Sequence, residues 1–336
     1  MNEIAANLDP QHPSAPPRDF SVILPVYFNE GCLWPLVESL RAKVLERTDG
    51  LRGELIFVDD GSGDGSYEEL IAIQKKHPAF VHVIKLTRNF GQVSALTAGF
   101  HYTRSKCVIT LSADGQDPPE LINEMLRGHF VEGYQVVVCT RSGRDESAFR
   151  SVTSKIFYNL MRRLAFPNMP PGGFDYILMS RRALAVYMRN ADAQPFLQGY
   201  VLWLGFKVKI IEYFRRARSA GRSRWTFGRK LTYLLDGVLS FSFFPIRWMS
   251  WLGFLTALLG FAYALLVFVI RIFYGNPVQG WAPIMIVILV LGGIQMIMLG
   301  VIGEYLWRTL AQTRKRDLFV VESVIPAKDS NEADHQ

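Results

Sequence analysis

The sequence contains only three cysteines and six histidines in 336 residues, and neither residue type forms a metal-binding pattern. Cys32, Cys107 and Cys139 are far apart and have apolar neighbours, which excludes a zinc cluster and predicts reduced, buried thiols in the cytosol. His82, His101 and His129 show no ligand or triad spacing. We therefore interpret the histidines as structural or surface residues.

Several common sequence motifs are also absent. The chain has no GxSxG turn, no P-loop, no GxGxxG dinucleotide motif and no internal repeat. We expect no signal peptide before the main body, and residues 1–18, which are polar and rich in proline, are expected to form a flexible tail.

The net charge of +7 raises the question of a nucleic-acid partner. Most of the basic excess, however, lies between Arg141 and Arg229 and directly after a long apolar segment near the C-terminus. We expect this charge to meet anionic lipid head groups and phosphates, and we expect no nucleic acid.

Two long apolar runs occupy residues 251–270 and 281–303, and neither contains a charged residue. A helix rises ~1.5 Å per residue, so each run is long enough for the ~30 Å hydrocarbon core of a bilayer. Trp251, Trp281 and Trp307 fit an interfacial aromatic belt. The alternative, a buried hairpin in a soluble protein, requires helices that are apolar all round. We predict two transmembrane helices, at about residues 249–272 and 281–304, within a membrane segment at 247–307.

The basic residues around these runs indicate their orientation. The connection at 272–280 has no Lys or Arg, whereas Arg308 and residues 314–316 follow the second run. By the positive-inside rule both ends of the hairpin face the cytoplasm, and residues 308–336 form a basic cytosolic segment. We expect an integral protein of the bacterial inner membrane with its active site and both termini in the cytoplasm.

Residues 226–246 link the main body to the first span. Phe227, Leu231, Leu235 and Val238 recur at helical spacing and form an apolar stripe. This pattern predicts an amphipathic helix that lies in the membrane interface. A core-packed helix is the alternative, and a second juxtamembrane helix near residues 164–191 has less support.

From residue 19 to residue 225, short β-type runs alternate with helical patterns. Strands are expected at 20–25, 54–58, 81–86, 108–112 and 135–140, and helices around 34–47, 67–76, 92–101 and 119–130. This alternation is typical of an α/β fold with a mostly parallel sheet. Ligands of such sheets bind at the carboxyl ends of the strands.

Two unusual loops follow the first two expected strands. In the first, PVYFNE, Pro25 ends the strand, Tyr27 offers a ring on which a base can stack, and Glu30 can accept hydrogen bonds. In the second, which begins with Asp59 and Asp60, the carboxylates suit a base edge or ribose hydroxyls, and the glycines allow close approach of the backbone. An ordinary strand-to-helix turn and a capped turn remain the alternatives.

The third loop, SADGQDPP at residues 112–119, carries the most chemistry. Asp114 and the side-chain carbonyl of Gln116 can share a hard divalent cation, because such a cation prefers oxygen ligands and keeps several waters. The cation would neutralise charge on a departing nucleoside diphosphate. The alternative is an ordinary helix entrance, in which Asp117 is the N-cap.

With these motifs in this order, the chain resembles the membrane-anchored polyprenyl-phosphate glycosyltransferases of glycosyltransferase family 2. The resemblance covers roughly residues 20–320 and rests on PVYFNE, DDGS, RNFGQ, SADGQDPP, GFDY, RSAGRSRW and the two apolar runs. It implies a GT-A fold, meaning a Rossmann-like and mostly parallel sheet, followed by interfacial helices and a two-helix transmembrane hairpin. It also implies a nucleotide-sugar donor, a polyprenyl phosphate acceptor and Mg²⁺ or Mn²⁺ as cofactor.

The resemblance assigns roles to individual residues. Asp114 and Gln116 are the implied metal ligands, and Asp175 matches an acidic residue near the reacting sugar. Implied catalytic residues are Asp114, Arg141, Arg150, Asp175 and Arg218. The acceptor phosphate is assigned to Arg141, Arg150, Ser154 and Arg218. The nucleotide sugar is assigned to Pro25, Tyr27, Glu30, Val58, Asp59, Asp60, Ala113, Asp114, Gln116 and Arg224.

Three residues depart from the pattern of the family. Relatives commonly have Asp-Ala-Asp at the metal loop, and here Ser112 replaces the first acid while Gly115 stands where Leu is frequent. A hydroxyl is a poorer ligand than a carboxylate, so metal affinity is expected to be lower or to depend on Asp114, Gln116 and the diphosphate. Arg224 stands where many relatives have Lys, which keeps the charge.

A lipid phosphate is already an anion at neutral pH, so the acceptor needs positioning and charge compensation more than a general base. The family implies direct displacement at the anomeric carbon with inversion, with UDP and undecaprenyl phosphate favoured over GDP and dolichyl phosphate. Two alternatives stay open. One is a non-catalytic scaffold that binds lipid or nucleotide sugar, and the other is a processive polysaccharide synthase, although Gly221 replaces the Gln of its Gln-x-x-Arg-Trp motif. Gly292, Gly293 and Gly300 allow close helix packing in a homo-oligomer.

Overall fold

The structure is a computed structural model that describes residues 18–48, 50–141, 159, 162–163, 168–170, 173–189, 197–214, 244–274, 281–314 and 317–327. The chain divides into two compact units. The first comprises Met1–Leu231 together with Asp317–Gln336, and the second comprises Thr232–Arg316.

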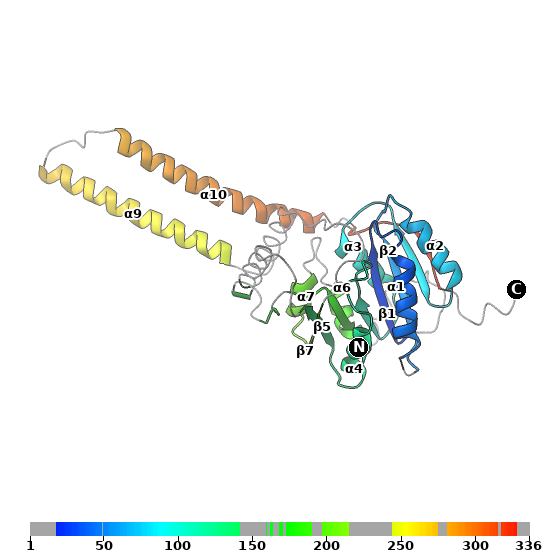
Figure 1. Ribbon diagram of the computed structural model, residues 1–336. Coiled ribbons are helices and arrows are strands. Elements are labelled where there is room, and N and C mark those ends of the chain that lie inside the picture. Colours follow the sequence, from blue (N-terminus) through cyan, green and yellow to red (C-terminus); the bar gives the residue numbers. More distant parts are fainter. Residues whose placement is uncertain are drawn as a thin grey trace. The chain divides into compact units, whose positions relative to one another are not determined.

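The first unit is built on an eight-stranded sheet with the order β7-β5-β6-β4-β1-β2-β3-β8 (Figure 1). Six strands run in one direction, and β6 and β8 run antiparallel to their neighbours. The mostly parallel sheet predicted from the sequence is therefore confirmed. The strands are β1 (Phe20–Val26), β2 (Gly53–Asp59), β3 (Val81–Leu86), β4 (Cys107–Thr110), β5 (Val136–Arg141), β6 (Tyr176–Ser180), β7 (Val208–Tyr213) and β8 (Val321–Ile325).

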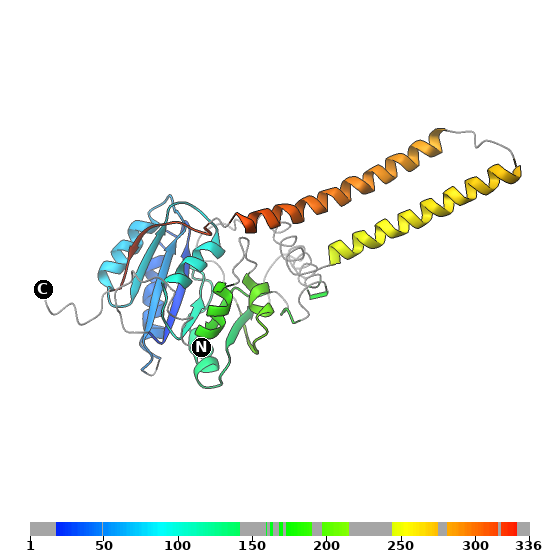
Figure 2. The same cartoon turned by 180° about the vertical axis from the view of Figure 1, so that it is seen from behind.

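Helices cover both faces of this sheet, so the strands between the two edge strands β7 and β8 are buried on both sides (Figures 1 and 2). On one face, apolar side chains of α1, α2 and α4 join the core cluster with Val22 and Leu24 of β1. On the other face α3 lies so close that a Cβ at Gly99 would be 2.3 Å from Ile23. The helices are α1 (Leu33–Leu40), the π-helical η2 (Arg41–Leu45), α2 (Ser66–Lys76), α3 (Gln92–Tyr102), α4 (Leu121–Phe130), α6 (Arg181–Arg189) and α7 (Leu197–Trp203).

Some elements differ from the sequence prediction. The helix expected at 34–47 is divided into α1 and η2. The region near 164–191, where a juxtamembrane helix was considered, contributes β6 and α6 to the sheet unit instead. The strands β6 and β7 were not predicted, because each is a short segment whose partners are distant in sequence.

The C-terminal segment also contributes to the sheet. Residues 308–336 are predicted as a basic cytosolic segment, and in the structure part of this segment, β8, pairs antiparallel with β3 at the edge of the sheet. Side chains reinforce the pairing: the hydroxyl oxygens of Tyr67 and Ser323 are 3.0 Å apart, and Lys85 Nζ is 3.0 Å from a carboxylate oxygen of Glu322. The chain therefore returns to the first unit after passing through the second.

A buried polar network lies at the amino ends of the central strands. Ser21 Oγ donates to Glu54 Oε1 at 2.5 Å, and His82 Nε2 is 2.9 Å from Glu54 Oε2. The backbone N–H of Ala327 donates to His82 Nδ1 at 3.2 Å, so the other ring nitrogen carries the proton and donates to Glu54. Burial alone would raise the pKa of Glu54. The interactions with His82 and the hydrogen bond from Ser21 together outweigh this effect, so the pKa of Glu54 is lowered.

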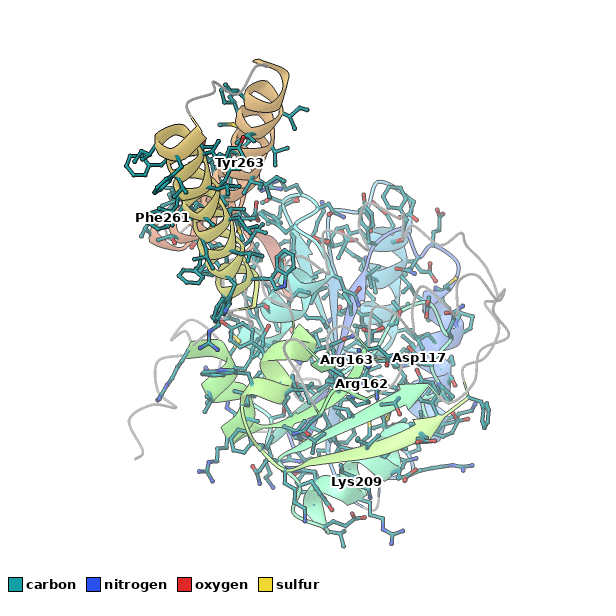
Figure 3. The ribbon with its side chains drawn as sticks, turned by 90° about the vertical axis from the view of Figure 1, so that its left-hand side faces the viewer. Asp117, Arg162, Arg163, Lys209, Phe261 and Tyr263 are labelled. Carbon is teal, nitrogen blue, oxygen red and sulfur yellow. The ribbon has the colours of Figure 1, made fainter. Side chains whose placement is uncertain are left out.

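The second unit consists of two long helices, α9 (Phe244–Tyr274) and α10 (Trp281–Thr313). Both contain a segment long and apolar enough to cross a membrane, Ile246–Ile270 and Ile286–Trp307, and these segments are not buried in the protein. Side chains such as Phe261 and Tyr263 project from α9 (Figure 3). α10 continues past residue 304, where the second span was expected to end. Of the amphipathic helix expected at 226–246, residues 226–243 lie outside the described residues, and residues 244–246 begin α9.

The buried Glu54 network predicts a pH-dependent contribution to stability. Because the pKa of Glu54 is lowered on folding, its ionised form stabilises the fold above its ordinary pKa of 4.5, and this stabilisation is lost as pH falls through the lowered value. We expect Glu54→Gln to lower the free energy of unfolding by about 1–3 kcal/mol at pH 6, and by less at pH 3.5. Thermal unfolding of the full chain in detergent, followed by near-UV circular dichroism, measures both values. The exposed Glu68→Gln is the control, and an equal loss at both pH values would contradict the assignment.

Candidate active site

The unusual loops of the sequence meet at one edge of the sheet. β1 pairs in parallel with β2 on one side and with β4 on the other, so the loops after these strands all leave from the carboxyl edge. The register pairs Pro25 with Val58 and Val26 with Asp59. Of the residues predicted to bind the nucleotide sugar, all those that the structure describes lie in or beside these loops. They are Pro25, Tyr27, Glu30, Val58, Asp59, Asp60, Ala113, Asp114 and Gln116.

Asp59 and Asp60 are buried, and both carboxylates are used inside the protein. Asp60 accepts hydrogen bonds from the backbone N–H groups of Phe90 and Gly91, at 2.7 and 2.9 Å, and so joins the loop after β2 to the start of α3. Asp59 accepts from the N–H of Ser62 at 3.3 Å. Burial is the largest effect on both aspartates and raises the pKa of each. The pair fixes the shape of the loop, a role that the sequence pattern did not distinguish from ligand contact.

The first loop is held on the second by its backbone. The N–H of Phe28 donates to Ser62 Oγ at 3.2 Å, and that of Asn29 donates to Ser66 Oγ at 2.8 Å. Phe28 has a φ of +58°, which is uncommon for a residue with a side chain. Tyr27 remains 37% exposed. Its ring is therefore presented at the edge of the sheet, where an aromatic base can stack on it.

Glu30 lies in this loop, and its carboxylate contacts the second loop. Glu30 Oε2 accepts from the N–H of Gly65 at 3.1 Å. Glu69, which sequence analysis did not single out, accepts from the N–H groups of Gly31 and Trp34 at 2.7 and 3.1 Å. These two carboxylates satisfy backbone donors at the entrance of α1 and α2 and hold the two loops together.

The third loop turns sharply around Asp114. Asp114 Oδ1 accepts from the N–H of Gln116 at 3.2 Å, and Gly115 between them has a φ of +67°. Gln116 and Asp117 are buried, and Tyr213 of β7 donates its hydroxyl proton to Asp117 Oδ1 at 2.5 Å. Asp117 is therefore a tie between the loop and β7, and the proposed role as N-cap of α4 is wrong, because that position is Glu120.

Asp175 lies at the same edge because β6 runs antiparallel and begins there. Thr110 Oγ1 donates to the carbonyl of Asp175 at 2.8 Å and accepts from the N–H of Ile177 at 3.1 Å. Continuing the pairing of Thr110 with Ile177 places Asp175 beside Ser112, at the start of the third loop. The fold thus places two predicted site residues that are far apart in sequence, Asp114 and Asp175, at the same edge of the sheet.

Three of the four residues predicted to bind the acceptor phosphate, Arg150, Ser154 and Arg218, lie outside the described residues, and so does Arg224. Arg141 is the last residue of β5, where it pairs with Tyr213 of β7, and its side chain is not among those described. Arg88, which sequence analysis included only within a motif, is exposed after β3, and its guanidinium lies 4.0 Å from the centre of the Phe90 ring. The carboxyl edge therefore carries at least one exposed cation in the part of the chain that is described.

The third loop fits a hard divalent cation that takes only a few ligands from the protein. It supplies one carboxylate, from Asp114, and one amide oxygen, from Gln116, and these are the oxygen donors that Mg²⁺ and Mn²⁺ accept. Among the described residues no group of three or more His, Cys, Asp and Glu is arranged to hold a metal ion. The remaining ligands would come from a substrate and from water, which is the usual arrangement for a cation bound with phosphates.

The fold and the site define a protein of the GT-A type, with a mostly parallel sheet and a carboxylate loop at its carboxyl edge. The family model described as Glycosyl transferase family 2 matches residues 21–188. An uncharacterized glycosyltransferase from Synechocystis is 35% identical over 309 residues, which cover 91% of this chain and 95% of the relative. The chain therefore belongs to glycosyltransferase family 2.

Other relatives carry more specific names. A prophage bactoprenol glucosyl transferase homolog of Escherichia coli is 31% identical over 305 residues, which cover 90% of this chain and 98% of the relative. The bactoprenol glucosyl transferase of Shigella phage SfX is also 31% identical, over 90% of this chain and 98% of the relative. Among solved structures, glucosyl-3-phosphoglycerate synthase from Mycobacterium tuberculosis has 22% identity and a TM-score of 0.46, with 66% of this chain and 79% of that chain covered.

Two glycines of the second loop make a matched test of its geometry. Gly61 has a φ of +69°, and a Cβ there would lie 2.6 Å from the backbone carbon of Arg88. At Gly63 the nearest atom to a Cβ would be 3.5 Å away, in ordinary contact with Phe28. We expect Gly61→Ala to lower the free energy of unfolding by about 1–3 kcal/mol, because the left-handed backbone and the close approach both become strained.

The control variant Gly63→Ala should change the free energy of unfolding by no more than about 0.5 kcal/mol. Thermal unfolding of both variants beside the unsubstituted protein gives the comparison. Equal melting temperatures for the two variants would show that the second loop does not need the geometry described.

Proposed function

We propose that this glycosyltransferase transfers a sugar from a UDP-sugar to undecaprenyl phosphate at a membrane, with inversion at the anomeric carbon. One observation carries the proposal: a carboxylate loop suited to a metal diphosphate occurs in a chain that also has two helices apolar enough to cross a bilayer. The names of the relatives support the lipid acceptor, since two of them are called bactoprenol glucosyl transferase or a homolog of it. The product would serve the glycosylation of envelope glycans or lipids.

The donor nucleotide would bind across the first two loops. The exposed ring of Tyr27 is available for the base, and the loop held by Asp59 and Asp60 presents backbone groups to the ribose. The diphosphate would then extend toward the third loop, where Asp114 and Gln116 lie. Along the carboxyl edge the first loop lies between the second and the third, because β1 lies between β2 and β4 in the sheet.

A bound Mg²⁺ or Mn²⁺ would be held by Asp114 and Gln116 and would neutralise charge on the departing nucleoside diphosphate. The hydrogen bond from Tyr213 to Asp117 ties the end of this loop to β7 and would help to fix the shape of the turn. Ser112 offers only a neutral hydroxyl at the position of a third ligand, so the diphosphate must supply a larger share of the coordination.

In the reaction, a phosphate oxygen of the lipid attacks the anomeric carbon as the bond from that carbon to the diphosphate breaks. The acceptor is an anion and loses no proton, so positioning and charge compensation carry the step. Arg141, Arg150, Ser154 and Arg218 are proposed to hold the acceptor phosphate and to lower the repulsion between the two anionic substrates. Asp175 would orient a hydroxyl of the sugar or a neighbouring arginine.

The basic residues around the two apolar helices bear on the orientation of the protein in the membrane. The connection between the two apolar helices lacks Lys and Arg, whereas Arg308 and Arg314 follow the second span. This distribution supports a cytoplasmic active site with both termini on the same side. A cytoplasmic site would give direct access to nucleotide sugars.

A second function, a scaffold that binds nucleotide sugar without transferring it, is favoured by one observation. Ser112 removes an acid from the metal loop. Turnover separates the two functions, because a scaffold binds the donor but leaves the sugar on the nucleotide.

Transfer from radiolabelled UDP- and GDP-sugars to undecaprenyl phosphate, with the purified full chain in detergent and Mn²⁺ or Mg²⁺, tests the proposal. We expect one UDP-sugar to yield a labelled lipid and Asp114→Asn to reduce its formation about 100-fold or more, since a metal ligand is lost. Asp317→Asn, at an exposed position, is the control. If the donor binds but no label reaches lipid, the scaffold function replaces the enzyme.

Metal removal gives a separate prediction. A chelator should abolish transfer, and added Mn²⁺ or Mg²⁺ should restore it, because the diphosphate leaves as a polyanion. Ser112→Asp should lower the metal concentration needed for half-maximal rate, since a carboxylate is a better ligand than a hydroxyl. The rate is measured against metal concentration for both proteins, and full activity in excess chelator would rule out the proposed cofactor.

A further inference from the structure

We propose that Gln198 of α7 is a positioning residue that holds the carboxylate of Asp175 in its working orientation. The inference rests on the proposed function, in which Asp175 orients a sugar hydroxyl or an arginine. Gln198 Nε2 donates a hydrogen bond to Asp175 Oδ1 at 2.9 Å. The two residues come from different elements, one preceding β6 and one within α7.

The backbone of Asp175 is already fixed by other contacts. Thr110 binds the carbonyl of Asp175 and the N–H of Ile177 through one hydroxyl, and Thr110 ends the strand that leads into the metal loop. The main chain therefore has little freedom at this point. What remains to be set is the rotation of the carboxylate, and the amide of Gln198 acts on that rotation.

Gln198 itself is buried, with 5% of its surface exposed. Its amide has one favourable orientation, because a flipped amide would place its own oxygen against the carboxylate of Asp175. In the observed orientation Oε1 is buried, and it has no hydrogen-bond partner among the described residues. An amide oxygen buried without a partner costs free energy, and an apolar side chain of similar size would avoid this cost. The hydrogen bond to Asp175 therefore explains the presence of an amide at this position better than packing does.

Aromatic contacts with neighbouring helices hold α7, the helix that carries Gln198, in place. Aromatic rings connect α3, α6 and α7: Phe100 contacts Tyr187 and Tyr187 contacts Tyr200, each with ring centres 5.8 Å apart. Within α7 itself, the ring centre of Trp203 lies 6.2 Å from that of Tyr200. All three contacts are edge-to-face, the geometry that aromatic pairs prefer. Gln198 thus reaches Asp175 from a rigid element, as precise positioning requires.

A neutral amide also suits the chemistry. It fixes the carboxylate without cancelling its negative charge, which a lysine or arginine would do. Asp175 therefore remains a full acceptor for a sugar hydroxyl. Loss of the amide would leave the charge in place and remove one hydrogen bond that sets its orientation, and misplacement of a reacting group by about 1 Å can cost about 100-fold in rate.

The test compares Gln198→Leu with Gln74→Leu in the transfer assay on the full chain. Gln74 is a matched control, because it is 6% exposed and donates one side-chain hydrogen bond, to the carbonyl of Pro326 at 3.1 Å, away from the carboxyl edge. We expect Gln198→Leu to lower kcat about 10- to 100-fold with KM for the donor within about twofold. Gln74→Leu should leave both constants unchanged.

The isosteric variant Gln198→Glu supplies a readout that loss of packing would not move. The introduced carboxylate repels Asp175 at neutral pH, and a shared proton restores a hydrogen bond between them as pH falls. The quantity measured is the ratio of kcat of this variant to kcat of the unsubstituted protein at the same pH. We expect this ratio to rise toward one as pH is lowered from 8 to 5.5. If Gln198→Leu does not fold, as judged by its melting temperature, this profile alone decides.

The outcomes are distinct. An active unsubstituted protein with equal kcat for Gln198→Leu and Gln74→Leu, or a Gln198→Glu profile parallel to that of the unsubstituted protein, overturns the role of Gln198 and leaves the proposed function standing. An unsubstituted protein that transfers no sugar from any donor overturns the proposed function, and the positioning role with it.

Discussion

The parallel pairing of β1 with β2 on one side and β4 on the other is the constraint on which the candidate site depends. Parallel neighbours place their carboxyl ends at one edge, so three loops that are separate in sequence become neighbours there. Such strands must be covered on both faces, and this explains why α3 approaches β1 so closely at Gly99. A slip in this pairing would separate the loops that follow β1, β2 and β4.

Buried polar groups at the two ends of the sheet have different uses. At the amino ends, Ser21, Glu54 and His82 satisfy one another and the backbone of the returning C-terminal segment. At the carboxyl edge, Asp60 accepts hydrogen bonds from the N–H groups of Phe90 and Gly91, and Asp117 accepts one from the hydroxyl of Tyr213. Several of the acids that mark this family in sequence therefore stabilise the loops of the site, and fewer are available for its ligands.

In the proposed reaction both the donor and the acceptor are anions. One carboxylate and one amide oxygen from the third loop are enough for a cation that also binds a diphosphate, and a second acid in place of Ser112 would add negative charge near an anionic acceptor. Two apolar helices in the second unit are consistent with an acceptor that resides in lipid. Within the first unit, Gln198 holds Asp175 without adding charge.

The sequence by itself determined the strands β1 to β5, the loops that follow them and the two long apolar helices. These features have local signals, since alternating and helical apolar periods, turn residues and uncharged runs can be read without knowing any contact. The tertiary structure decided the rest: β6, β7 and β8 joined the sheet, Glu30 and Asp117 became ties between elements, and Gln198 met Asp175. Each of these depends on partners distant in sequence, and such pairings leave no periodic trace in the segment itself, so only the packing of the sheet and helices selects them.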